Sequence, residues 1–247
     1  ISIVTINRPE VYNAVHPPLS LELDQVWNEF IQDSEQWVAV LTGAGDKAFS
    51  AGNDLKYSAQ PGKYKVQQPK SGFAGLTNRF DRTKPIIAAV NGFAMGGGME
   101  TALSCDIILA SENAKFALPE VKVGFFAAAG GVQRLSRQIG KKAALEMILT
   151  GRSVDAKEAL KLGIVNDVFS QSELLDKAIE KANVIAGNCP SSIKYSLEAL
   201  NHMDQLEEMS SALEKSYELI DLLRQTEDHK EGVSAFVEKR APQWKNK

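Results

Sequence analysis

The sequence predicts an α/β fold in which most strands run parallel. Apolar strands recur along the chain, and each is followed by a glycine-bearing turn or a helical segment. The strands predicted at 37–42 and 86–90 are almost uninterrupted apolar runs, as expected when both faces of a parallel sheet are covered. The order of strand, turn and helix occurs at least twice, and it therefore favours the α/β class.

The first part of the chain contains two predicted strands and one long helix. Residues 1–6 alternate in polarity and meet Arg8-Pro9, which indicates an edge strand that ends in a turn. Pro18 then opens an amphipathic helix, because proline is tolerated in the first helical turn. The second strand, 37–42, stops at Gly43. The predicted apolar helix positions are Leu19, Leu21, Leu23, Val26, Trp27 and Phe30.

The remainder changes from strands to helices. Strand 86–90 ends at Asn91-Gly92 and strand 106–110 ends at Ser111, whereas after Lys141 only 164–168 has a strand pattern. We therefore predict a spiral core over residues 1–190 and a helical C-terminal region over residues 191–247. The predicted helices are 143–149, 156–162, 174–186 and most of 191–238. The last segment has an apolar stripe typical of a packing or subunit surface: Leu206, Met209, Leu213, Tyr217, Ile220 and Leu223.

Composition restricts the classes of partner. The 247 residues are 44% apolar and 24% charged, as in ordinary globular proteins, and the formal charge of −3 argues against nucleic acid or an anionic membrane surface. Two cysteines are too few for a disulfide framework and favour a reducing compartment. We expect a cytoplasmic protein. The chain starts inside a predicted strand without a Met, which leaves an organellar targeting peptide open.

A triple-glycine turn is the most informative feature. Gly96-Gly97-Gly98 follows an apolar strand and opens a helix that carries Glu100. Glycines at a helix start leave backbone N–H groups accessible to a ligand oxygen. Glu100 read alone fits a surface residue at a helix N-terminus, where the helix dipole favours negative charge. Its apolar neighbours favour instead a buried carboxylate with a raised pKa, suited to exchanging protons near neutrality.

A second carboxylate follows on a Pro-Glu turn. Pro119 restricts the backbone before Glu120, and the apolar, small-residue run 124–131 is suited to lining a narrow pocket around that carboxylate. The alternative for Glu120 is an ordinary residue at a helix N-terminus. Neither glutamate is convincing alone. Together with the glycine turn, they form the minimum set for moving a proton beside a stabilised oxyanion.

The segment 49–55 supplies a third element. Its small residues after a strand permit close backbone approach, so the N–H of Asn53 is a candidate oxyanion donor beside that of Gly97. An ordinary Asx turn at Asn53-Asp54 is an equally good interpretation of the spacing. The three elements together predict an enzyme that acts on an activated carbonyl group.

Several other chemistries lack their sequence signals. No GK[ST] follows the glycines, no G-x-S-x-G elbow is present, and the three histidines are scattered along the chain. A metal site is not expected, because no His, Cys or Asp cluster has ligand spacing. The lysine-rich stretch 56–72 fits a solvated loop or, alternatively, a lid beside a phosphate-bearing substrate.

A series of short motifs occurs in order along nearly the whole chain: Asn7-Arg8-Pro9, Asn13-Ala14, Leu41-Thr42-Gly43, Phe49 to Leu55, Ala89 to Gly92 with Gly96 to Gly98, Cys105-Asp106, Pro119-Glu120, Gly130-Gly131 with Arg134-Leu135, Thr150-Gly151 with Ala156, and Gly163-Ile164-Val165. In this order they resemble the motifs of the enoyl-CoA hydratase/isomerase (crotonase) superfamily. Within that superfamily, the sequences at 72–77, 116–120 and 238–245 are most similar to carnitinyl-CoA dehydratases.

The resemblance implies a crotonase-like spiral of ββα repeats whose helical C-terminal region builds homotrimers or hexamers. It also implies an acyl-CoA thioester substrate, with coenzyme A as part of the substrate and no separate cofactor. By this resemblance Glu100 and Glu120 are the catalytic residues, and Asn53 and Gly97 supply the oxyanion N–H groups. The residues implied for coenzyme A or substrate binding are Ala14, Ala51, Gly52, Asp54, Leu55, Phe125 and Ala128.

Two carboxylates favour hydration or dehydration over isomerisation of a double bond. Within that reaction class, general enoyl-CoA hydratase and carnitinyl-CoA dehydratase stay close rivals. The bulk of Phe125 and Phe126, and alanines where typical hydratases carry Pro-Gly, leave the acyl group undetermined. An enoyl-CoA isomerase, which needs one glutamate, is the alternative in the same fold, and a non-catalytic scaffold or RNA-binding relative is the remote one.

Overall fold

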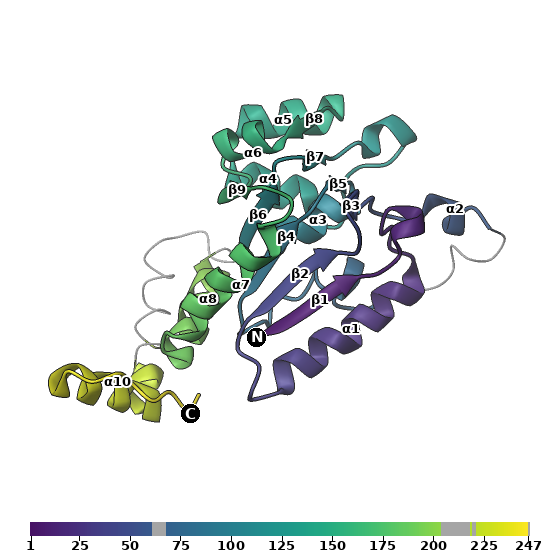
Figure 1. The fold of residues 1–247 in the computed structure, drawn as a ribbon. Coiled ribbons are helices and arrows are strands. Elements are labelled where there is room, and N and C mark those ends of the chain that lie inside the picture. The colour runs from purple at the N-terminus through teal and green to yellow at the C-terminus, as the bar shows by residue number, and fades with distance from the viewer. Residues whose placement is uncertain (61–67, 204–217, 219–220, 247) are drawn as a thin grey trace.

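Two sheets form the centre of the computed structural model, which describes residues 1–60, 68–203, 218 and 221–246 (Figure 1). The larger sheet has the strand order β1-β2-β4-β6-β9, and all its pairs are parallel. The smaller sheet has the order β3-β5-β7-β8, and only its β7–β8 pair is antiparallel. The strands are β1 (Ser2–Ile6), β2 (Ala39–Gly43), β3 (Ala48–Ser50), β4 (Ile86–Val90), β5 (Phe93–Met95), β6 (Ile107–Ser111), β7 (Lys115–Ala117), β8 (Ser153–Asp155) and β9 (Asp167–Phe169).

The larger sheet is covered on both faces, as its apolar runs predict. Alternate residues of its strands pack on opposite sides. Val40, Ile87 and Leu109 contact helix α7 (Leu174–Ala186). Leu41, Ala88 and their neighbours face the main core, together with α1 (Pro17–Gln32) and α3 (Gly97–Leu103). The prediction of a largely parallel α/β fold is therefore confirmed.

The remaining helices surround these layers. Figure 1 shows α8 and α10 lying beyond the sheets, and α10 packs against α8. Most of the predicted apolar stripe and the centre of the lysine-rich stretch lie outside the described residues. The proposed domain division at residues 190 and 191 stays a prediction. The other helices are α2 (Leu55–Ser58), α4 (Gly131–Gln138), α5 (Lys141–Thr150), α6 (Ala156–Leu162), α8 (Pro190–Met203) and α10 (Glu227–Glu238), with 3-10 turns η1 (Pro9–Val11), η3 (Phe73–Gly75) and η4 (Glu120–Val123).

Several local predictions differ from the structure, among them strand 106–110, observed at Ile107–Ser111, and helix 143–149, observed at Lys141–Thr150. The strand predicted from Trp37 begins at Ala39, because the Trp37 indole N–H donates to the Ser34 carbonyl in the preceding loop. Leu21 is 43% exposed rather than part of the buried helix face. The strand predicted at 164–168 begins only at Asp167, since Ile164 and Val165 are buried in the turn that follows the left-handed Gly163.

Asn91 joins the ends of β2 and β4 where the chain passes to the smaller sheet. Its side-chain oxygen accepts from the Gly43 N–H at 3.1 Å, and its amide nitrogen donates to the Gly43 and Gly45 carbonyls, each at 2.8 Å. The side chain is buried, so no water replaces these contacts. Asn91 thus holds the crossover that leads to both glycine-rich segments.

Asn91→Asp is expected to lower the free energy of unfolding by about 3 kcal/mol, because it removes two donors and places an acceptor against two buried carbonyls. Urea denaturation measures the effect. Asn113→Asp is the matched control, since Asn113 is exposed and its 3.4 Å contact with the Asp46 carbonyl is weak. Equal losses in both variants would contradict the role given to Asn91.

Candidate active site

The two glycine-rich segments pack backbone against backbone. A Cβ atom built on Gly98 would lie 2.1 Å from the Ser50 carbonyl oxygen, and one on Gly52 would lie 2.8 Å from the Gly97 nitrogen. Gly52 also has φ +85°, a conformation that side-chain-bearing residues rarely adopt. Only glycine therefore permits β3 and the segment after it to approach the start of α3 this closely.

This approach brings the N–H groups of Asn53 and Gly97 to one place. Val15 pairs in parallel with Asn53, donating to Gly52 and accepting from Asp54, so the N–H of Asn53 points away from that pairing. Gly97 is the first residue of α3, whose N–H has no partner within the helix. Among the described residues neither N–H has a hydrogen-bond partner. The pair is geometrically suited to hold one oxygen atom.

Glu100 lies inside the protein rather than on its surface. It is 4% exposed, and Oε1 of its carboxylate accepts from the Gly131 N–H at 2.9 Å. The backbone of Ala129 forms a further hydrogen bond to the same carboxylate. A Cβ on Gly131 would come within 3.0 Å of the Glu100 side chain, so the start of α4 packs directly on it. The interpretation of Glu100 as a surface residue is therefore wrong.

Glu120 approaches the same place from the other side. It begins the 3-10 turn η4, and its Oε1 lies 3.0 Å from the position of a Cβ on Gly96, the residue before α3. Its other carboxylate oxygen, Oε2, is buried and has no hydrogen-bond partner in the described structure. A buried acceptor without a partner is costly unless it serves a ligand. The Oε2 atom of Glu120 is therefore available to a hydrogen-bond donor from outside the chain.

The environment favours the protonated form of both carboxyl groups. Burial raises the pKa of Glu100 to about 7, and the negative charge of Glu120 adds to the rise, while the Gly131 and Ala129 N–H groups and the Arg134 charge oppose it. Burial also raises the pKa of Glu120 above its usual value. Two neighbouring carboxyl groups with raised pKa values can accept and donate protons near neutral pH.

The segment predicted to bind coenzyme A is held against residues 12–15. Ala51 N–H donates to the Tyr12 carbonyl at 2.9 Å, and Arg8 contacts both the Ala14 carbonyl at 2.7 Å and the Asp54 carboxylate at 3.0 Å. Asp54 also caps α2, which begins at the half-exposed Leu55, by accepting from the Tyr57 N–H. The Asp54 side chain caps the helix while the Asn53 N–H stays unpaired among the described residues. The Asx-turn interpretation and the oxyanion-donor interpretation of this segment are therefore compatible.

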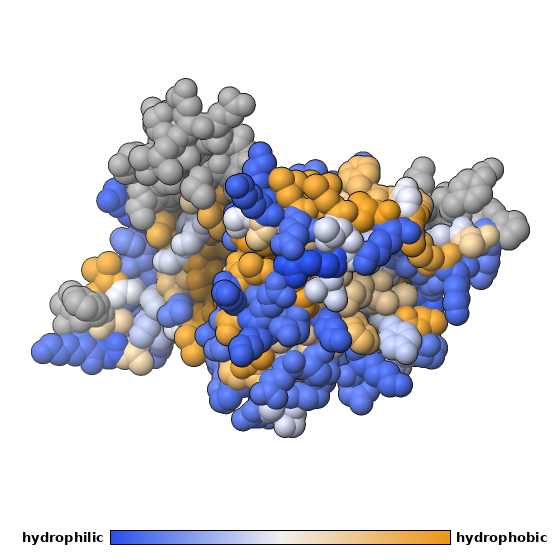
Figure 2. All heavy atoms as spheres, turned by 90° about the horizontal axis from the view of Figure 1, so that it is seen from above, coloured by the Kyte–Doolittle hydropathy of each residue, from blue (hydrophilic) through white to orange (hydrophobic). Residues whose placement is uncertain are grey.

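The loop 124–131 lies partly on the surface. Phe125 and Phe126 are 66% and 64% exposed, Ala128 is also exposed, and Ala127 is buried. Figure 2 looks onto the molecule from the side on which α5 lies in Figure 1, and it shows hydrophobic residues among hydrophilic ones on this face. The loop therefore contributes an apolar, accessible rim after Glu120.

The contacts of Gly131 and Ala129 with Glu100 were not predicted from the sequence. The available signal was a Gly-Gly pair that opens a second helix, α4, by the same logic as the glycines before α3. Spacing along the chain does not show which carboxylate such N–H groups face. The pairing became visible only when α3 and α4 were placed side by side.

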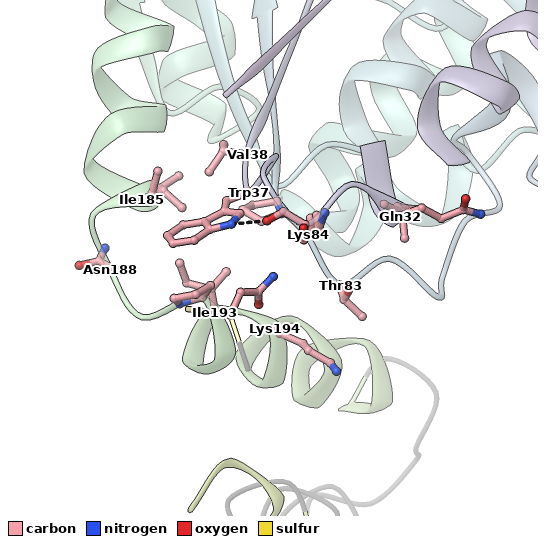
Figure 3. Close-up of a pocket in the computed structure, with 15 residues that line it drawn as sticks. Gln32, Trp37, Val38, Thr83, Lys84, Ile185, Asn188, Ile193 and Lys194 are labelled. Atoms are coloured by element: carbon pink, nitrogen blue, oxygen red, sulfur yellow. Dashed lines mark hydrogen bonds between the residues drawn. The ribbon is translucent and has the colours of Figure 1, made fainter. Parts of the chain in front are cut away.

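A separate cavity contains neither glutamate among its lining residues. Figure 3 shows Trp37, Ile185 and Ile193 around it. Val38 and Pro85 also line it and precede β2 and β4 of the larger sheet, whereas the two carboxylates follow β5 and β7 of the smaller sheet. The cavity therefore belongs to the junction between the sheet and the C-terminal helices rather than to the site of Glu100 and Glu120.

No helix in the described ranges is both long and apolar enough to cross a membrane. No three His, Cys, Asp or Glu side chains in those ranges gather as ligands for a metal ion.

Comparison with known proteins gives consistent matches over the full length. The family model described as enoyl-CoA hydratase/isomerase matches residues 1–247. A short-chain-enoyl-CoA hydratase of Clostridium acetobutylicum is 43% identical over 97% of this chain and 92% of its own length. A carnitinyl-CoA dehydratase of Salmonella typhi is 42% identical over 99% of this chain and 94% of its own.

Solved structures agree with the sequence matches. The crystal structure of an enoyl-CoA hydratase from Mycobacterium tuberculosis superposes with a TM-score of 0.92 at 36% identity, covering 99% of this chain and 95% of that one. An enoyl-CoA hydratase from Bacillus anthracis gives a TM-score of 0.91 at 35% identity, with the same coverage. The fold expected from the sequence motifs is therefore confirmed.

Proposed function

This chain belongs to the enoyl-CoA hydratase/isomerase family and is an enzyme of the enoyl-CoA hydratase type. On this premise we propose that it adds water to a 2-enoyl-CoA, or removes water from a 3-hydroxyacyl-CoA, with Glu100 and Glu120 as the catalytic residues. The observation that carries the proposal is the meeting of the buried Glu100 and the partly buried Glu120, whose Oε2 has no partner among the described residues, with two unpaired backbone N–H groups.

The proposed mechanism uses each of these groups once. The thioester carbonyl oxygen accepts from the Asn53 and Gly97 N–H groups, which stabilise the negative charge that develops on it. Ionised Glu100 accepts a proton from water while the water oxygen bonds to the β-carbon. Protonated Glu120 donates its proton to the α-carbon of the enolate. After these steps Glu100 carries a proton and Glu120 has lost one. Transfer of a proton from Glu100 to Glu120 therefore restores the starting state of the enzyme.

Binding of the rest of the substrate is assigned to the segments beside these donors. We propose that coenzyme A lies against Ala14 and against Ala51, Gly52, Asp54 and Leu55, which the Arg8 contacts hold together. Phe125 and Ala128, both exposed on the loop after Glu120, would border the acyl group. The acyl chain length depends on this loop.

Purified protein is expected to consume crotonyl-CoA, which is followed as loss of absorbance at the conjugated thioester band. Crotonobetainyl-CoA separates a carnitinyl-CoA dehydratase from a short-chain hydratase, because its trimethylammonium group requires an anion or aromatic face. A 3-enoyl-CoA tests the isomerase alternative. Hydration of neither conjugated substrate, with turnover of the 3-enoyl-CoA, would reject the proposed reaction. Failure to bind any coenzyme A thioester would favour the non-catalytic alternative.

We also propose that the chain assembles as a homotrimer, or as a hexamer of two trimers. Support comes from large apolar side chains left exposed on the single chain, among them Val123, Phe126 and Leu149. Light scattering after size-exclusion chromatography should give three or six times the 26.9 kDa of one chain. A mass of 26.9 kDa at micromolar concentration would reject the assembly.

A further inference from the structure

Arg134 joins α4 to the segment that follows η3. Its Nη2 donates to the buried Thr77 carbonyl at 2.7 Å, and its guanidinium lies over the Phe80 ring at 5.6 Å. Its Nη1 contacts the Ala129 carbonyl at 3.4 Å. The guanidinium thus spans two segments that are more than fifty residues apart in the sequence.

The same guanidinium shapes the turn before α4. A Cβ on Gly130 would lie 2.1 Å from Arg134 Nη1, and Gly130 has φ +100°. The backbone conformation of the turn therefore favours glycine, and a side chain at this position would also displace the Arg134 guanidinium. Since the residues on either side of Gly130 supply the N–H groups that bind Glu100, Arg134 contacts the element that orients this carboxylate.

Two charged groups face Glu100 from the elements packed against it. Glu120 of η4 opposes its ionisation, and Arg134 of α4 favours it. The neighbouring basic residue of α4, Arg137, lies one turn further along the helix and is exposed. It therefore provides a matched comparison for Arg134 on the same helix.

We propose that Arg134 is a positioning residue for the hydration reaction: its guanidinium fixes the Ala129–Gly131 turn and thereby orients Glu100 toward the reacting water. The inference rests on the proposed function for its catalytic meaning. The contact network itself is independent of which acyl group the enzyme accepts. Arginine is suited to this task because its planar fork reaches two carbonyl groups at once, which the lysine ammonium does not do in the same geometry.

The first test compares pH profiles of kcat/KM for Arg134→Gln, Arg134→Lys and Arg137→Gln. Arg134→Gln is expected to lower kcat about 10-fold, because Glu100 is less well oriented. It should also move the fall of kcat/KM at acidic pH (the acid limb) upward by about half a pH unit, because ionised Glu100 loses a nearby cation. Arg134→Lys should lower kcat but keep the limb near its wild-type position, since the charge is retained. Arg137→Gln should change neither. An unmoved limb in Arg134→Gln, or an equal shift in Arg137→Gln, would overturn the proposal.

A second test needs no catalytic activity, so it separates failure of this inference from failure of the proposed function. The melting temperatures of Arg134→Gln, Glu100→Gln and the double variant form a cycle at pH 5 and pH 8. At pH 8, Arg134→Gln should lower the melting temperature more in the chain that has Glu100 than in the chain that has Glu100→Gln. At pH 5 Glu100 is protonated, so Arg134→Gln should lower the melting temperature by the same amount in both backgrounds. Additive shifts at both pH values would contradict the electrostatic coupling between the two residues on which the inference depends.

Discussion

Replacing either Glu100 or Glu120 by glutamine is expected to lower kcat for hydration by about 10²–10⁴-fold, the usual contribution of a positioned acid or base. Glutamine keeps the shape of each side chain and the Gly131 N–H contact of residue 100. It can neither take a proton from water nor deliver one to the α-carbon. The measurement is the initial rate of absorbance loss with the preferred enoyl-CoA, for each variant at saturating substrate.

The control for these variants is Glu112→Gln. Glu112 is exposed in the turn between β6 and β7 and should leave kcat unchanged. Binding of the product thioester should survive in both active-site variants, because the Asn53 and Gly97 N–H groups are untouched. A Glu100→Gln enzyme that keeps most of its activity would instead support the one-glutamate isomerase. Loss of thioester binding together with activity would indicate a structural role for the glutamates.

The second large effect is a gain of stability in Glu100→Gln that depends on pH. The pKa of Glu100 in the folded protein is about 7, against an ordinary value of 4.5, so the folded state binds more protons than the unfolded state between these two values. The contribution of Glu100 to stability therefore falls as pH rises from 4.5 to 7 and then stays level. Glutamine carries no charge, so the variant should be more stable than wild type by up to about 3 kcal/mol at pH 8, with little difference near pH 4.

Urea denaturation at pH 4, 6 and 8 measures this difference. Glu112→Gln is the control, because Glu112 is exposed in the folded protein, and this variant should not reproduce the stability difference expected for Glu100→Gln. A Glu100→Gln variant that is less stable than wild type at pH 8 would mean that the ionised carboxylate gains more from its N–H donors than it loses by burial. Stability gained together with activity lost is the expected signature of a carboxylate kept buried for catalysis.

Local sequence rules placed the longer elements well. The helices predicted at 156–162 and 174–186 and the strand predicted at 86–90 have the observed bounds. Each has an unambiguous period or apolar run, and each ends at a residue that stops it, such as the left-handed Gly163 after α6. The smaller sheet was not predicted. Its strands have three residues each, too few to show a period of two.

The candidate site was predicted in its parts but not in its arrangement. Glu100, Glu120, Asn53 and Gly97 were selected because of glycines, a proline and the family resemblance, and the structure brings them together. Their catalytic roles remain proposals. Gly131 contacts Glu100, 31 positions away in the sequence, and Gly96 lies beside Glu120, 24 positions away. No pattern of neighbouring residues in the sequence indicates either contact.

The sequence by itself determined the fold class, the helix that carries Glu100 and the glycine turns that allow close backbone approach, because these depend on periodicity and on backbone conformations local to a few residues. Only the tertiary structure decided that Glu100 is buried, that its pKa lies near 7 and that the Arg134 guanidinium covers the turn that holds it. Burial, desolvation and charge–charge contact depend on distances in space between distant segments. Those distances exist only after α3, α4 and η4 have packed together.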